Sequence, residues 1–158
     1  MLTVILIIQF YDRGKGFNYM ERQIYKLIIL NKNSTESSDP DTLLKLYELY
    51  DRHRDAILWF LEEFDANTYD EYLQRYSGTS TGRSYFISVC GFFELSGVLI
   101  EHGMINEDLY FDMFNPTPFW QKAEKTVAGM RNKRPHIYEN FELLNNKRAN
   151  WRGKKSQK

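Results

Sequence analysis

The stretch RSYFISVCGFFELSGVLIEH, residues 83–102, decides the fold of this chain. Apolar and aromatic side chains recur along it so densely that a helix over these residues keeps almost no polar face. A helix that is apolar all round is typical of the buried centre of a bundle. Gly103 follows directly and is expected to end the helix in the C′ position. The sequence therefore predicts a central helix against which other helices pack.

Upstream of the central helix, two further helices are expected. Asp39-Pro40 supplies an N-cap and a proline at the first helical position. Apolar residues then recur at helical spacing and predict one helix from about 41 to 64. A shorter helix is expected near Tyr69–Tyr76, and the loop Ser77–Gly82 leads into the central helix.

Downstream of the central helix, three more helices are expected. Asn106 is an N-cap for a short helix whose first turn is acidic, which suits the helix dipole. Thr117-Pro118 repeats the cap-plus-proline signature before a helix over Phe119–Met130, and a last helix covers about His136 to Ala149. Residues 41–149 are thus predicted to form a mainly α, single-domain bundle of about five or six helices.

Residues 1–40 comprise an apolar segment and a polar linker. Leu2–Phe10 (LTVILIIQF) is rich in β-branched residues and could pair with Gln23–Leu30 as a small N-terminal β-hairpin. The second of these stretches also fits a helix that starts at Met20. Met20 could also be the true start of translation, so whether residues 1–19 are native stays open.

Composition points to one globular domain. The chain has 158 residues, of which 42% are hydrophobic and 27% are charged, the balance of a soluble globular protein. No apolar run approaches the roughly 20 residues of a membrane-spanning helix, so we expect no transmembrane span and a cytoplasmic protein. The single cysteine excludes an intramolecular disulfide framework and any multi-cysteine zinc site.

Charge is distributed unevenly, although the net charge is zero. Residues 41–120 hold five Lys or Arg and fourteen Asp or Glu, whereas residues 121–158 hold eleven and three. This asymmetry can reflect an electrostatic contact with an anionic partner. It can equally mean that the basic part lies against the acidic body, within the chain or between copies.

A family resemblance rests on the stretch from Phe92 to Leu144. It reads FFELSGVLIEHGMINEDLYFDMF, followed by Trp120, Arg131, Pro135 and YENFELL. This ordered set resembles a family of small helical prokaryotic proteins catalogued only as a domain of unknown function. The resemblance implies a helical fold and brings no activity, ligand or catalytic residue with it.

No constellation of residues predicts a cofactor or a catalytic centre. The three histidines, His53, His102 and His136, lie on different predicted helices, which argues against a metal site. Cys90 lies inside the apolar helix, where a free cysteine usually acts as a small hydrophobe. The hydroxyl-rich loop Gly78–Gly82 is followed by Arg83 rather than the lysine of a phosphate-binding P-loop, so helix capping explains it better. We therefore expect no cofactor, and we rank an enzyme last among the function classes.

Glu94 falls in the middle of the most apolar segment. An unpaired buried carboxylate is costly, so Glu94 needs a partner, a raised pKa or an exposed position. Our hypothesis is that Arg131 or a tyrosine hydroxyl satisfies it. An enzyme with a pocket around Glu94 is the least favoured of three functional alternatives.

The C-terminal end suggests a second alternative, non-specific contact with nucleic acid. Residues 150–158 are expected to form a frayed basic tail. Phosphates would attract its cations and a base could stack on its tryptophan. The candidate contact residues are Lys147, Arg148, Trp151, Arg152, Lys154 and Lys155, with a second basic cluster at Arg131, Lys133 and Arg134. The tail is short and matches no established recognition module.

The favoured interpretation is a non-enzymatic interaction or regulatory domain, with self-association into a homo-oligomer as one form of that interaction. Aromatic residues beyond those that the core can hold would favour self-association or a partner groove. The candidates for such exposed aromatics are Tyr69, Tyr72, Tyr76 and Tyr110. The sequence itself names neither the partner nor the oligomeric state.

Overall fold

The computed structural model describes residues 39–155. The chain divides into two units, residues 1–37 and 38–158, and the described residues all belong to the second. The expected N-terminal hairpin, the alternative helix from Met20 and most of the polar linker lie outside the described residues.

The described part of the chain is entirely helical and contains seven helices and no strand. The helices are α3 (Asp39–Arg52), α4 (Arg54–Glu62), α5 (Tyr69–Arg75), α6 (Thr81–Glu101), α7 (Glu107–Met113), α8 (Thr117–Arg131) and α9 (Glu139–Lys155). The expected mainly α bundle is confirmed. The expected count of five or six helices is too low, because the segment predicted to form one helix over 41–64 forms two.

The expected single helix over 41–64 is broken at His53. This residue has φ −97° and ψ 18°, outside the helical range, and its backbone N–H donates to the carbonyl of Tyr50 three residues back. Neither glycine nor proline marks the break in the sequence. On its two sides, Tyr50 packs edge-on against Phe92 and Phe60 stacks on Phe86. The break thus lets α3 and α4 each contact a different part of α6.

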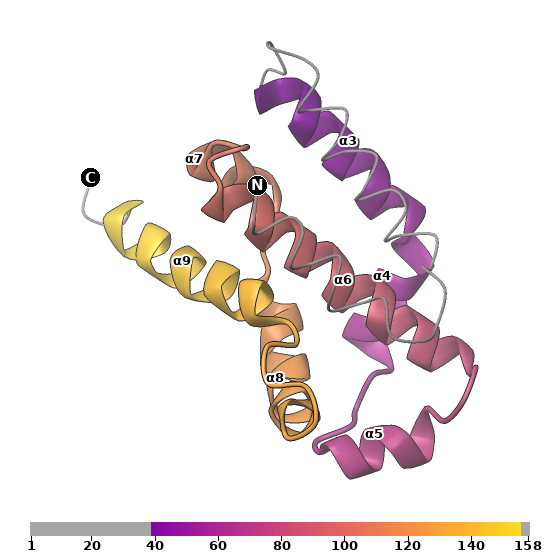
Figure 1. Cartoon of the computed structure of the whole chain (residues 1–158). Helices are drawn as coiled ribbons and strands as arrows, with labels where there is room; N and C mark the ends of the chain where they lie inside the picture. Colours follow the sequence, from indigo (N-terminus) through magenta and orange to yellow (C-terminus); the bar gives the residue numbers. More distant parts are fainter. Residues whose placement is uncertain (1–38, 156–158) are drawn as a thin grey trace. The chain divides into compact units, whose positions relative to one another are not determined.

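Helix α6 is the centre of the bundle, as the sequence predicts. Figure 1 shows α6 running between α9 on one side and α3 with α4 on the other, and α9 and α4 make its most extensive helix contacts. Its buried residues are Phe86, Val89, Cys90, Phe92, Phe93, Leu95, Ser96, Gly97, Leu99 and Ile100. A chain of rings crosses the core through it, because Phe93 stacks on Phe141 of α9 at 4.9 Å and meets Phe119 of α8 at 4.7 Å.

Within residues 39–155, α6 is the one helix that is long and apolar enough to cross a membrane by length and composition. Length and composition alone do not decide whether a helix spans a membrane, so the expected absence of a transmembrane span stays a prediction. More than half of its most apolar stretch is buried inside the protein, and the core helix of a globular protein has the same length and composition.

Most helix boundaries follow the expected capping signals. Gly103 has φ +63° just after α6, and the Asn106 side chain accepts a hydrogen bond from the backbone N–H of Leu109 at the start of α7. The Ser80 hydroxyl accepts from the N–H of Arg83, so capping is confirmed for the loop before α6. Thr117 is the first residue of α8 rather than its cap.

Helix α9 begins and ends later than expected. It starts at Glu139 rather than near His136, and it continues to Lys155 rather than ending at Ala149. The expectation of a frayed tail is therefore wrong for residues 150–155, because Trp151 is buried and anchors the end of the helix.

Helices α6 and α9 approach each other closely at Gly97. A Cβ atom added there would overlap the carbonyl oxygen of Asn140 and come within 2.6 Å of its carbonyl carbon. Both atoms belong to the backbone of α9, so neither can turn aside as the end of a side chain can. Only glycine at position 97 therefore permits this spacing of the two helices.

We expect Gly97→Ala to lower the free energy of unfolding by about 2 kcal/mol or more, because the two helices must separate. Urea denaturation of the full chain measures the change. Gly153→Ala is the matched control, since a Cβ there meets nothing within 4 Å and alanine favours a helix over glycine by about 0.5–1 kcal/mol. Equal effects of the two substitutions would contradict the close packing at Gly97.

Candidate functional site

Hydrogen bonds to the Glu94 carboxylate link the start of α9 to α6. Its Oε1 accepts a hydrogen bond from Nδ2 of Asn140 at 2.8 Å, and its Oε2 accepts one from the backbone N–H of Phe141 at 2.9 Å. Both donors lie in the first turn of α9, whose backbone N–H groups have no partner within their own helix. A side chain of α6 thus supplies the N-terminal cap of α9.

Burial raises the pKa of Glu94, and the hydrogen bonds from Asn140 and Phe141 oppose that shift. The expected pairing of Glu94 with Arg131 or a tyrosine is wrong, because amide donors of α9 occupy both carboxylate oxygens. An enzymatic role for this carboxylate therefore finds no support in its contacts.

Arg131 stabilises the connection between α8 and α9 through hydrogen bonds and an ion pair. Its Nε donates to the carbonyl of Ile137 at 3.1 Å, and its two terminal nitrogens donate to the carbonyl of Tyr138 at 3.3 Å and the carboxylate of Glu142 at 2.6 Å. The guanidinium also lies 5.9 Å from the ring centre of Trp120. Because these contacts hold Tyr138 at φ 55° just before α9, Arg131 and Glu94 position the same helix start.

Trp151 is buried between α9 and α7 and is 8% exposed. Its indole N–H donates to the carboxylate of Asp108 at 2.6 Å, and its ring lies 5.7 Å from that of Phe111. Arg148 lies over the same indole at 4.3 Å and donates to the carbonyl of Phe111 at 2.9 Å. The tryptophan that could have stacked on a base is therefore covered.

Two lysines of α9 complete its contact with acidic residues. Lys147 lies 3.4 Å from Glu101 and 3.9 Å from Glu107, and Lys155 pairs with Asp112. One of the two interpretations of the charge asymmetry is thus confirmed, since the basic end lies against acidic residues of the same chain. Arg152 and Lys154 are exposed, and nucleic-acid contact through them stays a prediction.

The tyrosines that were expected to be exposed do not form the apolar part of the surface. Tyr72 and Tyr110 are buried, and Tyr69 and Tyr76 are half-buried. The large apolar side chains that remain exposed are Leu44, Tyr47, Leu58, Leu61, Leu109 and Met113. Four of these six lie on α3 and α4.

The exposed apolar residues of α3 and α4 follow one pattern, and we call them the outer stripe: Leu44, Tyr47, Leu58 and Leu61. Each directly follows a buried residue of the core face, in order Leu43, Leu46, Ile57 and Phe60. In both helices the two members are three residues apart and therefore neighbours on one side of the helix. The second pair follows the first after 14 residues and lies beyond the break at His53, so each helix contributes one pair.

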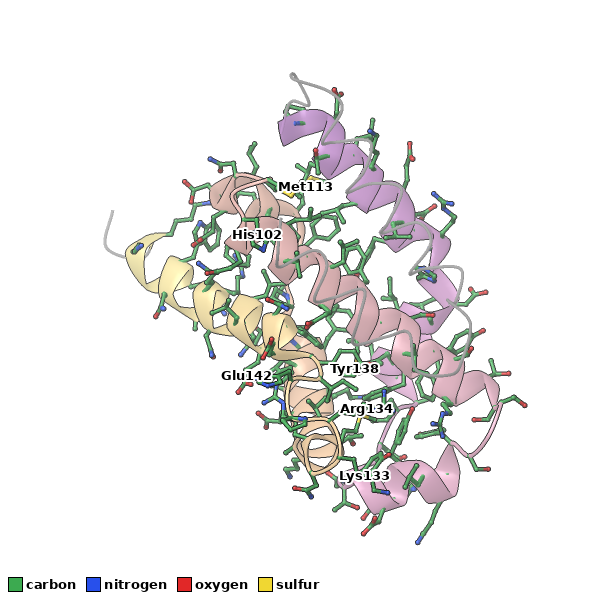
Figure 2. The ribbon with its side chains drawn as sticks, viewed as in Figure 1. His102, Met113, Lys133, Arg134, Tyr138 and Glu142 are labelled. Atoms are coloured by element: carbon green, nitrogen blue, oxygen red, sulfur yellow. The ribbon has the colours of Figure 1, made fainter. Side chains whose placement is uncertain are left out.

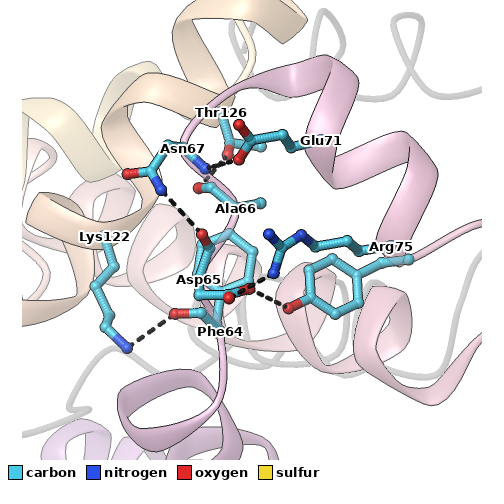
Figure 3. Close-up of polar contacts among 9 residues, drawn as sticks. Phe64, Asp65, Ala66, Asn67, Glu71, Arg75, Lys122 and Thr126 are labelled. Atoms are coloured by element: carbon cyan, nitrogen blue, oxygen red, sulfur yellow. Dashed lines mark hydrogen bonds and ion pairs between the residues drawn. The ribbon is translucent and has the colours of Figure 1, made fainter.

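The loop between α4 and α5 is held by side chains of α8 (Figure 3). The Lys122 ammonium donates to the carbonyls of Phe60, Leu61 and Phe64 at 3.1, 2.6 and 2.9 Å. The hydroxyl of Thr126 donates to the carbonyl of Ala66 at 3.3 Å. Lys122 thus satisfies carbonyl groups at the end of α4 that have no partner within the helix.

No group of three or more His, Cys, Asp or Glu residues in the described range could hold a metal ion. His102 is exposed at the end of α6, and His136 lies 2.9 Å from Glu139. His53 is half-buried; burial and the charge of Arg52 lower its pKa. Cys90 is buried and unpaired, and burial raises the pKa of its thiol, which keeps it unreactive.

We expect the stability of the wild type relative to Glu94→Gln to fall as pH rises. Burial raises the pKa of Glu94 above its ordinary value of 4.5, so ionisation costs more in the folded than in the unfolded chain. The difference in unfolding free energy should fall from pH 4.5 up to the raised pKa and then stay constant. Urea denaturation at several pH values measures it, with the exposed Glu124→Gln as control. A difference that rises with pH would contradict the assignment.

We expect Lys122→Met to lower the free energy of unfolding by about 2 kcal/mol, because charged hydrogen bonds to backbone carbonyls are lost. Methionine keeps most of the length and apolar stem of the lysine. The control is Lys125→Met, which removes an exposed lysine of the same helix. Thermal and urea denaturation compare the two, and equal stabilities would show that Lys122 does not cap α4.

Comparison with known proteins supports the expected family. A family profile described as "Domain of unknown function (DUF4760)" matches residues 37–151. No curated protein and no solved structure matches the chain. The matched range contains the Glu94 cap, the Lys122 cap and Trp151, and the prokaryotic origin stays a prediction. Because the profile covers most of its length, the chain belongs to the DUF4760 family.

Proposed function

We propose that this chain is a non-enzymatic interaction domain that associates with a second copy of itself through the outer stripe. The observation that carries the proposal is the regular exposure of Leu44, Tyr47, Leu58 and Leu61, which are 58%, 49%, 45% and 38% exposed. Scattered exposed apolar residues need no explanation, but a repeated arrangement on neighbouring helices favours an interface.

The charges at the middle of the stripe favour a second copy as the partner. Asp51 and Arg54 lie between the apolar pairs in the sequence, one at the end of α3 and one at the start of α4, and both are exposed. Neither has an ion pair or a side-chain hydrogen bond within residues 39–155. In a two-fold symmetric, antiparallel pairing, Asp51 of one copy faces Arg54 of the other, and each apolar pair faces the opposite apolar pair of the partner. The stripe is therefore complementary to itself in charge and in hydrophobicity.

The contact is expected to be of moderate strength. The apolar side chains are already partly covered, so association removes only part of their surface from water. Exposed ion pairs contribute roughly 0.2–1 kcal/mol each and set the orientation of the partners more than the affinity. The break at His53 keeps each helix short, so two helices per copy must contribute. A reversible dimer fits these conditions.

We expect the full chain to dimerise reversibly, and Asp51→Arg and Arg54→Asp each to weaken the dimer by on the order of tenfold, about 1.4 kcal/mol. Each single substitution places two like-charged pairs across the two-fold axis. The double variant Asp51→Arg/Arg54→Asp restores both opposite-charge pairs and should regain the wild-type dissociation constant within about threefold. Sedimentation equilibrium over a range of concentrations measures all four proteins.

The apolar contribution is tested by Leu44→Ser/Leu58→Ser, which should abolish the dimer without unfolding the chain, since both side chains are exposed. The matched control is Leu109→Ser/Met113→Ser, which removes two equally exposed apolar residues from α7 and should leave the dimer intact. A monomeric wild type at all concentrations, or a double charge variant weaker than both single variants, would refute the proposal.

A further inference from the structure

The backbone of His53 is shared by the end of α3 and the start of α4. Its N–H donates to the carbonyl of Tyr50 in α3 at 3.1 Å, and its carbonyl accepts from the N–H of Ile57 in α4 at 2.9 Å. Its φ of −97° and ψ of 18° interrupt the helix between these two bonds, and no side chain caps the start of α4. The placement of α3 relative to α4 therefore depends on this one residue.

The imidazole of His53 is placed so that it accepts the neutral form only. The side chain is half-buried, and its Nε2 is buried without a hydrogen-bond partner within residues 39–155. In a neutral imidazole one ring nitrogen carries no proton, whereas a protonated imidazole carries a proton on both. Protonation therefore creates either a charged donor at Nε2 without an acceptor or a break in the surrounding packing, and a buried charge without a partner is costly.

The charges of α3 and α4 oppose protonation as well. Burial and the positive charge of Arg52, in the last turn of α3, lower the pKa of His53. The start of α4 adds the partial positive charge of a helix N-terminus. Asp51, Arg54 and Asp55, the other charged residues next to the break, are exposed.

The other elements of the core do not compensate a charge at His53. No acidic side chain of another helix pairs with it in the described part of the chain. Burial raises the pKa of the hydroxyls of Tyr50 and Tyr110, so both stay neutral. Glu94 of α6 is bound by the start of α9, and Lys122 of α8 donates to carbonyls at the end of α4.

We propose that protonation of His53 loosens the junction between α3 and α4 and makes this junction sensitive to acid. When the junction opens, the imidazole reaches water and can carry its charge there. The sign follows from the lowered pKa in the closed junction: closure is fully favoured above the ordinary value of 6.5 and weakens as pH falls below it. For a group with that ordinary value, a fall from pH 7.5 to 5.5 favours opening by at most about tenfold.

An open junction also affects the outer stripe, because α3 and α4 each contribute one of its two apolar pairs. Acid is therefore expected to raise the dissociation constant of the dimer several-fold. This consequence rests on the proposed dimer, whereas the acid sensitivity of the junction does not.

Hydrogen exchange of the full chain, followed by mass spectrometry at pH 7.5 and 5.5 and corrected for the intrinsic exchange rates, tests the junction. We expect α3 to open several-fold more often at pH 5.5, measured against peptides of α6 that report global unfolding. His53→Gln and His53→Asn do not titrate and should both lose this response. Asparagine is also a favoured N-cap residue, so the second variant keeps the start of α4.

The matched control is His102→Gln, which removes an exposed histidine just after α6 (Figure 2) and should keep the response of the wild type. Glu94 titrates in all of these proteins, so its contribution cancels in the comparison. An unchanged α3 in the wild type at pH 5.5, or an undiminished response in both His53 variants, overturns the proposal.

Sedimentation equilibrium at the same two pH values tests the consequence for the dimer. A dimer that weakens at pH 5.5 in the wild type and in His102→Gln, but not in the two His53 variants, supports the coupling. A wild type that is monomeric at pH 7.5 refutes the proposed dimer, and the exchange of α3 then still decides for or against the junction.

Discussion

The pairing of α6 with α9 is the constraint on which the bundle depends. Gly97 lets the two backbones approach, and Glu94, one turn earlier, accepts hydrogen bonds from the first turn of α9. A carboxylate in this apolar helix is unfavourable by itself, as its raised pKa indicates. It is retained because the start of α9 would otherwise present unsatisfied N–H groups to the core. The buried carboxylate of Glu94 and the unpaired N–H groups at the start of α9 are each unfavourable alone, but each supplies the hydrogen-bond partner that the other lacks.

The placement of α9 determines how the charges of the chain are distributed. Once α9 begins beside Glu94 and continues for 17 residues, its basic end reaches α7. There Asp108 accepts from Trp151 and Asp112 pairs with Lys155. The basic end of the sequence is therefore partly neutralised by acidic residues of the same chain. A region that resembles a nucleic-acid contact in sequence is largely an intramolecular contact in the fold.

Features that depend on neighbouring residues could be predicted from the sequence, whereas contacts between residues far apart in the sequence could not. The apolar run of α6, the stop at Gly103 and the cap at Asn106 each depend on a few neighbouring residues, and all are confirmed. The partner of Glu94 lies 46 residues away in the chain, so its identity depends on how α9 packs. The break at His53 has no local signal either, because packing against α6 determines it.

The same distinction explains which charges of the C-terminal half are neutralised. Most charged side chains of this half have partners that the fold itself supplies, as Lys147 and Arg131 do. Lys147 belongs to α9 and its two acidic partners to α6 and α7, so this pairing follows from helix packing and not from spacing in the sequence. An uneven distribution of charge along a chain is therefore evidence about internal packing before it is evidence for an anionic partner.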